Sequence, residues 1–203
     1  MMLYLKIITL LVFAGLLHPK ENGKVQRNST NLFVADAGMF STGDIVMRKG
    51  KGFISEMFRK TSQRDQQFSH AGVIEVKKTG VYVVHVIENP QDSGSHLKTE
   101  TLESFCSSSY NQGYAIYRYD FFSGKEKAIS GYLKRLKSSG VKFDENFDLQ
   151  TGSALYCTEL IYKLCLESTG YELKLSGYAA NKYVGLDDLY LHKEARLITK
   201  QTY

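Results

Sequence analysis

Two apolar, β-branched stretches separated by three residues constrain the fold of this chain more than any other feature of its sequence. Residues 68–77 and 81–88 have the composition of strands, and Lys78-Thr79-Gly80 between them is a turn sequence. So tight a turn makes the two strands antiparallel neighbours, because parallel strands need a much longer crossover. The sequence therefore predicts an antiparallel hairpin.

Further strand and helix patterns surround this hairpin. Strand patterns occur at residues 45–47, 97–98 and 114–119. Helical spacing of apolar residues, or a helical start signal, occurs at residues 52–60, 101–105, 125–138 and 157–168. Thr101 is expected to cap the second of these helices, and Gly170 to end the last. The predicted fold class is α+β, with an antiparallel sheet or partial barrel packed against helices.

Composition narrows the function classes. The 203 residues carry a formal charge of only +5, and the lysines are scattered without a basic run or interleaved aromatic residues, so a nucleic-acid partner is not expected. The sequence contains no CxxC, HExxH, phosphate loop or dinucleotide fingerprint. We therefore predict no metal and no cofactor.

The first residues have the layout of a targeting segment. One positive charge precedes the apolar run 7–17, and the polar stretch that follows contains no cysteine for a lipid anchor. The expected organisation is a signal peptide or N-terminal anchor at 1–20, a polar linker at 21–40 and one domain at 41–203. This favours export to the periplasm or cell envelope over a cytosolic location, with membrane association through the apolar segment as an open alternative.

Cys157 is the first candidate for chemistry. It opens the predicted helix 157–168 and lies on its apolar stripe, since Leu160 and Leu164 follow at i+3 and i+7. A structural role as a small buried thiol is the alternative. In the first helical turn, however, unpaired N–H groups and the helix dipole stabilise a thiolate, and the Cys157 N–H can serve an oxyanion. Glu159 would act in the opposite direction if it leaned towards the sulfur.

His70 is the candidate base for this thiol. Its neighbours Ser69, Ala71 and Gly72 are small, which leaves room for a group to approach the imidazole. A histidine in an apolar strand is also a common hydrogen-bonded core residue, so His70 alone does not establish a site.

A catalytic histidine needs a third group that fixes its tautomer and orientation. The neighbouring strand offers His85 and Glu88, which differ in parity and therefore point to opposite faces of a regular strand. Only one of them can face His70. Glu88 is preferred, because a carboxylate stabilises an imidazolium, and His85 is the alternative.

Two other sets of residues have structural interpretations. Asp187 and Asp188 are expected to cap a helix before Leu189. Cys106 and Cys165 are expected to be reduced and buried, although a disulfide between them is the alternative if Cys157 is catalytic.

Six segments together resemble the permuted papain-like cysteine hydrolases of the YiiX/YebB group, relatives of the NlpC-type cell-wall peptidases. They occur in the order of that group, at Gly43-Asp44-Ile45-Val46, Phe68-Ser69-His70-Ala71-Gly72-Val73, Val86-Ile87-Glu88, Gly140-Val141-Lys142-Phe143-Asp144, Tyr156-Cys157-Thr158-Glu159-Leu160 and Asp187-Asp188-Leu189-Tyr190. The resemblance implies a permuted papain-like fold without a metal. Its site would consist of the nucleophile Cys157, the base His70 and the orienting acid Glu88. Two positions depart from the group, where Thr158 replaces the usual Ser and Phe143 the usual Tyr.

The principal hypothesis is an exported cysteine hydrolase that cleaves a peptide or other amide, such as a peptidoglycan stem peptide. A lipid-acting thiol acyltransferase or phospholipase on the same fold is the first alternative, which an essential His85 would favour. A non-catalytic binding module is the second.

Overall fold

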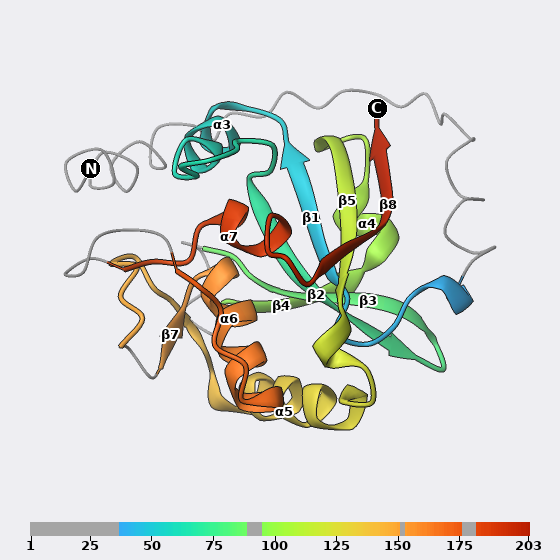
Figure 1. Ribbon diagram of the computed structural model, residues 1–203. Helices are drawn as coiled ribbons and strands as arrows, with labels where there is room; N and C mark the ends of the chain where they lie inside the picture. The colour runs from blue at the N-terminus through green and yellow to red at the C-terminus, as the bar shows by residue number, and fades with distance from the viewer. Residues whose placement is uncertain (1–36, 89–94, 151–152, 176–181) are drawn as a thin grey trace.

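An antiparallel sheet of six strands organises the computed structural model, which describes residues 37–88, 95–150, 153–175 and 182–203 (Figure 1). The strand order is β4-β3-β2-β1-β5-β8, and every neighbouring pair is antiparallel. The strands are β1 (Ile45–Gly50), β2 (His70–Lys77), β3 (Gly80–Val86), β4 (Leu97–Thr101), β5 (Asn111–Tyr119) and β8 (Ala195–Thr202).

Helices cover both faces of the sheet. They are α3 (Phe53–Arg59), α4 (Leu102–Cys106), α5 (Glu126–Ser139), α6 (Cys157–Thr169) and α7 (Leu186–Tyr190), with short 3-10 turns η2 (Ala37–Met39) and η3 (Asp120–Phe122). A separate parallel pair is formed by β6 (Lys142–Phe143) and β7 (Ala154–Leu155). Figure 1 shows α5 and α6 packed together on one side of the sheet.

The alternation of side chains in the central hairpin builds two cores. Val73 and Val84, which are opposite one another in the register, lie in the core under α6 together with Leu160. Ile74 and Val83, one residue further along, lie in the core on the other face, which α4 covers. Because successive strand residues point to opposite faces, a single hairpin supplies both cores.

Most of the predicted elements are present. The β2–β3 hairpin turns tightly, with Lys77 paired to Gly80. The Thr101 hydroxyl accepts a hydrogen bond from the Ser104 N–H at 3.2 Å, so the predicted cap of α4 is confirmed. Gly170 ends α6 with a φ of 72°, a left-handed conformation that glycine adopts without strain. The α+β class is confirmed as an antiparallel sheet packed against helices.

The structure also differs from the predictions in its strands. β4 extends to Thr101 and β5 begins at Asn111, so both are longer than expected. The C-terminal strand β8 was not predicted, and it forms the edge of the sheet beside β5. Phe40, the last residue of the expected linker, is buried in the core under α4. The folded part therefore begins at least one residue before 41.

The predicted leader 1–20 and most of the predicted linker lie outside the described residues. Within the part of the chain that the structure describes, no helix is long and apolar enough to cross a membrane.

Candidate active site

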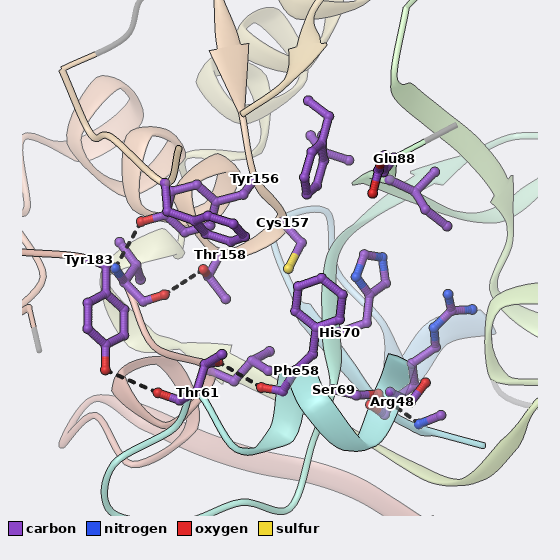
Figure 2. A pocket seen from close by; sticks show the side chains of 18 of the residues that line it. Arg48, Phe58, Thr61, Ser69, His70, Glu88, Tyr156, Cys157, Thr158 and Tyr183 are labelled. Carbon is purple, nitrogen blue, oxygen red and sulfur yellow. Dashed lines mark hydrogen bonds between the residues drawn. The ribbon is translucent and has the colours of Figure 1, made fainter. Parts of the chain in front are cut away.

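Cys157 and His70 lie on the wall of the same cavity, which has a volume of about 1760 Å³. Cys157 is the first residue of α6 and His70 the first of β2, so the cavity lies where the helix begins against the end of the strand. Figure 2 shows the Cys157 sulfur pointing into this cavity towards the His70 imidazole. The structure thus brings the predicted nucleophile and base together, and their catalytic roles remain predictions.

Two hydrogen bonds to Val184 fix the start of α6. The Tyr156 hydroxyl accepts the Val184 N–H at 3.0 Å, and the Thr158 hydroxyl donates to the Val184 carbonyl at 2.6 Å (Figure 2). The residues on both sides of Cys157 are therefore tied to one backbone unit, which restricts movement of the thiol. Thr158 stands where Ser was expected, and its hydroxyl makes the bond to the Val184 carbonyl.

Glu159 does not lean towards the thiol. One of its oxygens accepts the Tyr156 N–H at 3.2 Å, and the other lies 2.8 Å from the Lys163 ammonium. These contacts cap the first turn of α6 and turn the carboxylate away from Cys157.

Burial raises the pKa of Cys157 to about 11. Backbone N–H groups of Ala71, Thr158 and Cys157 itself, together with the charge of Arg48, act in the opposite direction and stabilise a thiolate. With its pKa raised in this way, the resting form of Cys157 at neutral pH is the neutral thiol. The backbone N–H groups act in the expected direction, but burial has the larger effect on the pKa.

His85, the alternative orienting residue, contacts His70. The Nε2 atom of His70 lies 2.9 Å from the Nδ1 atom of His85. The hairpin register explains this contact, because one step beyond the Val73–Val84 pair His85 lies opposite Gly72. His85 and His70 therefore point to the same face.

A carboxylate that the sequence analysis missed completes this chain of hydrogen bonds. Glu100 of β4 lies with Oε1 3.0 Å from His85 Nε2, and its other oxygen accepts the Ser104 hydroxyl at 2.5 Å. The hydrogen bond from His85 is the largest influence on Glu100 and lowers its pKa to about 2. Glu100 is therefore ionised at neutral pH and can only accept.

The ionised Glu100 determines the tautomers of both histidines. It accepts the proton on His85 Nε2, which leaves His85 Nδ1 as an acceptor. His70 must then donate from Nε2, which leaves a lone pair on its Nδ1. Burial, followed by the charges of His85, Arg48 and Lys98, holds the pKa of His70 well below its usual value, so the ring is neutral at neutral pH, which is the form that a general base needs.

The surroundings of the two imidazoles are apolar on one side. The Phe105 ring of α4 lies 5.8 Å from the His70 ring and 5.2 Å from the His85 ring, measured between centroids. Gly72 provides the space for His85, because a Cβ at this position would lie 2.5 Å from Val83 Cγ1 and 3.1 Å from His85 Cβ. The absence of a side chain at Gly72 thus makes room for His85.

Glu88 lies elsewhere on the cavity wall. Figure 2 shows its carboxylate apart from the His70 ring, and among the described residues no hydrogen bond joins the two. Burial and the charge of Glu145 raise its pKa. The predicted contact between Glu88 and His70 is therefore corrected, because Glu88 lies beyond the end of β3 and His85, within the strand, contacts His70 instead.

The remaining predicted residues have structural contacts. The Asp188 carboxylate accepts the Gly185 N–H at 2.9 Å at the start of α7, as a cap does. Asp187 accepts the Arg64 N–H at 2.7 Å and so holds the segment that precedes β2. Cys106 and Cys165 are free and buried in the two separate cores, so the sheet lies between them.

No protein-family model matches the chain, and a comparison with curated protein sequences finds no match. Among solved structures, the chain is similar to YiiX from Escherichia coli O157:H7, with a TM-score of 0.62 and 15% sequence identity. The match covers 80% of this chain and 98% of the YiiX chain.

YiiX is described as a metalloprotein. Within residues 37–88, 95–150, 153–175 and 182–203, no three His, Cys, Asp or Glu side chains are grouped so that they could hold a metal ion. His70, His85 and Glu100 instead form a line in which each ring nitrogen of His85 already has a partner, and this arrangement does not fit a metal site. The likeness concerns the arrangement of the sheet and helices, and on that evidence this chain has a YiiX-like fold.

Proposed function

We propose that this chain is a cysteine-dependent hydrolase of the permuted papain-like type that acts on an amide, with Cys157 as nucleophile and His70 as general base. One observation carries the proposal. The Glu100–His85–His70 chain of hydrogen bonds leaves a basic nitrogen on His70 at the cavity that Cys157 also faces. In this position the lone pair can accept the proton of the Cys157 thiol.

The proposed reaction begins with a neutral thiol and a neutral imidazole. As the Cys157 sulfur bonds to the acyl carbon, its proton passes to His70 Nδ1, and the new imidazolium is stabilised through His85 by the charge of Glu100. His70 then gives that proton to the leaving amine as the carbon–nitrogen bond breaks. Water, deprotonated by His70, attacks the thioester, releases the acid and restores the thiol.

Backbone N–H groups supply the electrostatic part of this mechanism. Those of Ala71, Cys157 and Thr158 lie near the sulfur and lower the pKa of the thiol. The N–H groups of the first turn of α6 have no partner within the helix, so they can stabilise the oxyanion of a tetrahedral intermediate. His85 and Glu100 act on the reaction through His70, His85 by its bond to that ring and Glu100 by its bond to His85, so we assign both as positioning residues.

Acylation by p-nitrophenyl acetate tests the proposal without knowledge of the natural substrate. After an acid quench, intact-protein and peptide mass spectrometry should find one acetyl group on Cys157, formed in a burst and then hydrolysed. The rate should fall by about 100-fold or more in His70→Ala, and the adduct should be absent in Cys157→Ala. Equal acetylation rates in the native chain and His70→Ala would contradict the proposal and favour a binding module.

A lipid-acting acyltransferase or phospholipase is the second candidate. The specific observation in its favour is that His85, an imidazole, occupies the orienting position in place of a carboxylate. The cavity also has an apolar wall built from Ile54, Phe58, Phe147 and Leu175, which suits an acyl chain. Release of fatty acid from phospholipid vesicles without cleavage of muropeptides would select this candidate, and the reverse result would select the amidase. An exported enzyme would meet either substrate in the cell envelope.

A further inference from the structure

Arg48 is a charged residue of the same cavity that the proposed mechanism does not use. It lies on β1 directly opposite His70 in the antiparallel register, and it lines the cavity. Its guanidinium carbon lies 4.5 Å from the centroid of the Phe105 ring, and Nη1 donates to the Phe105 carbonyl at 3.4 Å. Figure 2 shows Arg48 on the same side of the cavity as His70.

The guanidinium has no carboxylate partner in the part of the chain that the structure describes. No Asp or Glu oxygen there lies within 4.0 Å of it. The charge of Glu100 reaches Arg48, but the oxygens of Glu100 are already bonded to His85 and Ser104. A partly buried cation that has no carboxylate in direct contact is costly, so a structural role for this charge is poorly supported.

Arg118 provides a comparison within the same sheet. Its Nε lies 2.6 Å from Asp44 Oδ1 and its Nη2 lies 2.7 Å from Asp44 Oδ2, so a partly buried arginine of this fold receives a bidentate carboxylate. Arg48 has the same set of N–H donors and stacks on Phe105. No carboxylate of the described residues accepts two of its N–H groups as Asp44 does for Arg118. An anion that comes from outside the chain would complete the same arrangement.

Charge is distributed unevenly around the cavity. Lys98 of β4 lies with Arg48 on the sheet side, and its ammonium is 3.5 Å from Glu100. Glu100, which is bonded to His85 and Ser104, is the acid of this side. The other acids that line the cavity, Glu88, Asp148 and Glu172, come from segments outside the six-stranded sheet. Arg48 and Lys98 thus outnumber the single carboxylate of Glu100 on the sheet side beside His70, which suits this side to a negative group.

We propose that Arg48 binds an anionic group of the substrate, a carboxylate or a phosphate, next to the acyl carbon that Cys157 attacks. This inference rests on the proposed function and narrows its substrate class. It requires that the substrate carry a negative charge within a few bonds of the scissile bond. A free C-terminal or side-chain carboxylate of a peptide supplies such a group, and so does the phosphate of a phospholipid.

Alkylation by two reagents of different charge tests the inference. Iodoacetate and iodoacetamide react with the same thiolate and differ in that only iodoacetate carries a carboxylate. The ratio of their second-order rate constants at Cys157, read by mass spectrometry, should fall about tenfold in Arg48→Gln and much less in Arg48→Lys, which retains the charge. Arg196→Gln is the control, because it removes one exposed positive charge on β8, away from the cavity.

Two results would overturn the inference. An unchanged ratio in a folded Arg48→Gln chain would mean that no anion is recognised there. An equal fall of both rates would mean that Arg48 only stabilises the thiolate, whose pKa its charge lowers. Measurement at about pH 10 keeps the ratio readable even if His70 proves not to activate the thiol, so failure of the proposed function and failure of this inference are distinguishable.

Protection experiments distinguish the two sources of the anion. Acetate and inorganic phosphate are tested separately for their ability to slow alkylation of Cys157 by iodoacetate in the native chain. Stronger protection by acetate would support a carboxylate-bearing peptide, and stronger protection by phosphate would support a phosphate-bearing lipid. Equal protection in the native chain and Arg48→Gln, or protection by neither anion, would contradict binding at Arg48.

Discussion

Two glutamates near the ends of adjacent strands have opposite electrostatic surroundings. Glu100 on β4 receives hydrogen bonds from His85 and Ser104, and its pKa is lowered to about 2. Glu88, after β3, is partly buried beside another acid, and its pKa is raised. The difference teaches that proximity to the cavity does not select the orienting acid. The sheet register decides which acid has a hydrogen-bond partner in His85, and that acid is Glu100.

The largest effect on this comparison is expected from His85→Gln, which breaks the connection between Glu100 and His70. Without His85 the His70 tautomer is no longer fixed, so we expect kcat/KM to fall about 10²–10³-fold. Steady-state kinetics measures the loss, and urea unfolding checks that the variant is folded. Activity within about threefold of the native chain would mean that His85 has only a packing role.

Glu100→Gln should have the next largest effect, because it removes the charge and keeps an oxygen that can accept from His85. We expect kcat to fall about tenfold with little change in KM, since a neutral amide stabilises the imidazolium less well than a carboxylate. A change confined to KM would contradict a positioning role. Normal kcat would show that the charge at the end of the chain is dispensable.

Gly72→Ala should disturb the pair by displacing His85. The added Cβ would lie 2.5 Å from Val83 Cγ1 and 3.1 Å from His85 Cβ, and overpacking of this kind costs about 1–3 kcal/mol of unfolding free energy. Gly131→Ala on α5 is the matched control, because only the end of the Arg135 side chain, at 3.9 Å, lies near its new Cβ. Equal unfolding free energies of the two variants in urea would mean that the hairpin adjusts to the added Cβ without loss of stability, which would contradict the prediction.

Acid should lower the stability of the protein in two separate pH ranges, as first the histidines and then Glu100 of this hydrogen-bond network become protonated. Burial lowers the pKa of both histidines below 6.5, so the unfolded chain binds their protons first and stability falls as the pH drops below that value. Glu100 has its pKa lowered from 4.5 to about 2, so its contribution is complete above 4.5 and is lost as the pH falls towards 2. Urea unfolding across pH should show a weaker dependence below 6.5 in His85→Gln. Identical dependence in both chains would contradict neutral buried histidines.

Glu88→Gln is expected to have the smallest effect. Because Glu88 makes no described contact with His70, kcat/KM should stay within about twofold of the native value. A loss comparable with that of His85→Gln would reverse the comparison and restore Glu88 as the orienting acid.

Local patterns in the sequence were sufficient to predict the part of the site that α6 supplies. Helical spacing places Cys157 at the start of α6, and Gly170 ends that helix where a left-handed residue is needed. The alternation of the hairpin likewise predicted that His85 and Glu88 point to opposite faces. Each of these features depends on residues that are close in sequence.

The sheet side depends on pairing between distant residues and could not be predicted in the same way. Parity separated His85 from Glu88, but only the register that places His85 opposite Gly72 decides which of them meets His70. Glu100 and Arg48 reach the cavity because β4 and β1 flank the hairpin. The alternation of residues 97–101 was the available signal for Glu100, and it was interpreted as a strand of only two residues.

The rate of alkylation of Cys157 by iodoacetamide, measured across pH by mass spectrometry in the native chain and in His70→Ala, tests the central claim most directly. Cys106 and Cys165 serve as internal controls, since both thiols are buried and should react only after unfolding. A thiol whose pKa is raised to about 11 is almost wholly protonated at neutral pH, so we predict that its reaction there depends on His70 as the base. The rate at neutral pH should then be lower by about tenfold or more in His70→Ala. Identical pH profiles in the two chains would contradict an activated pair of Cys157 and His70.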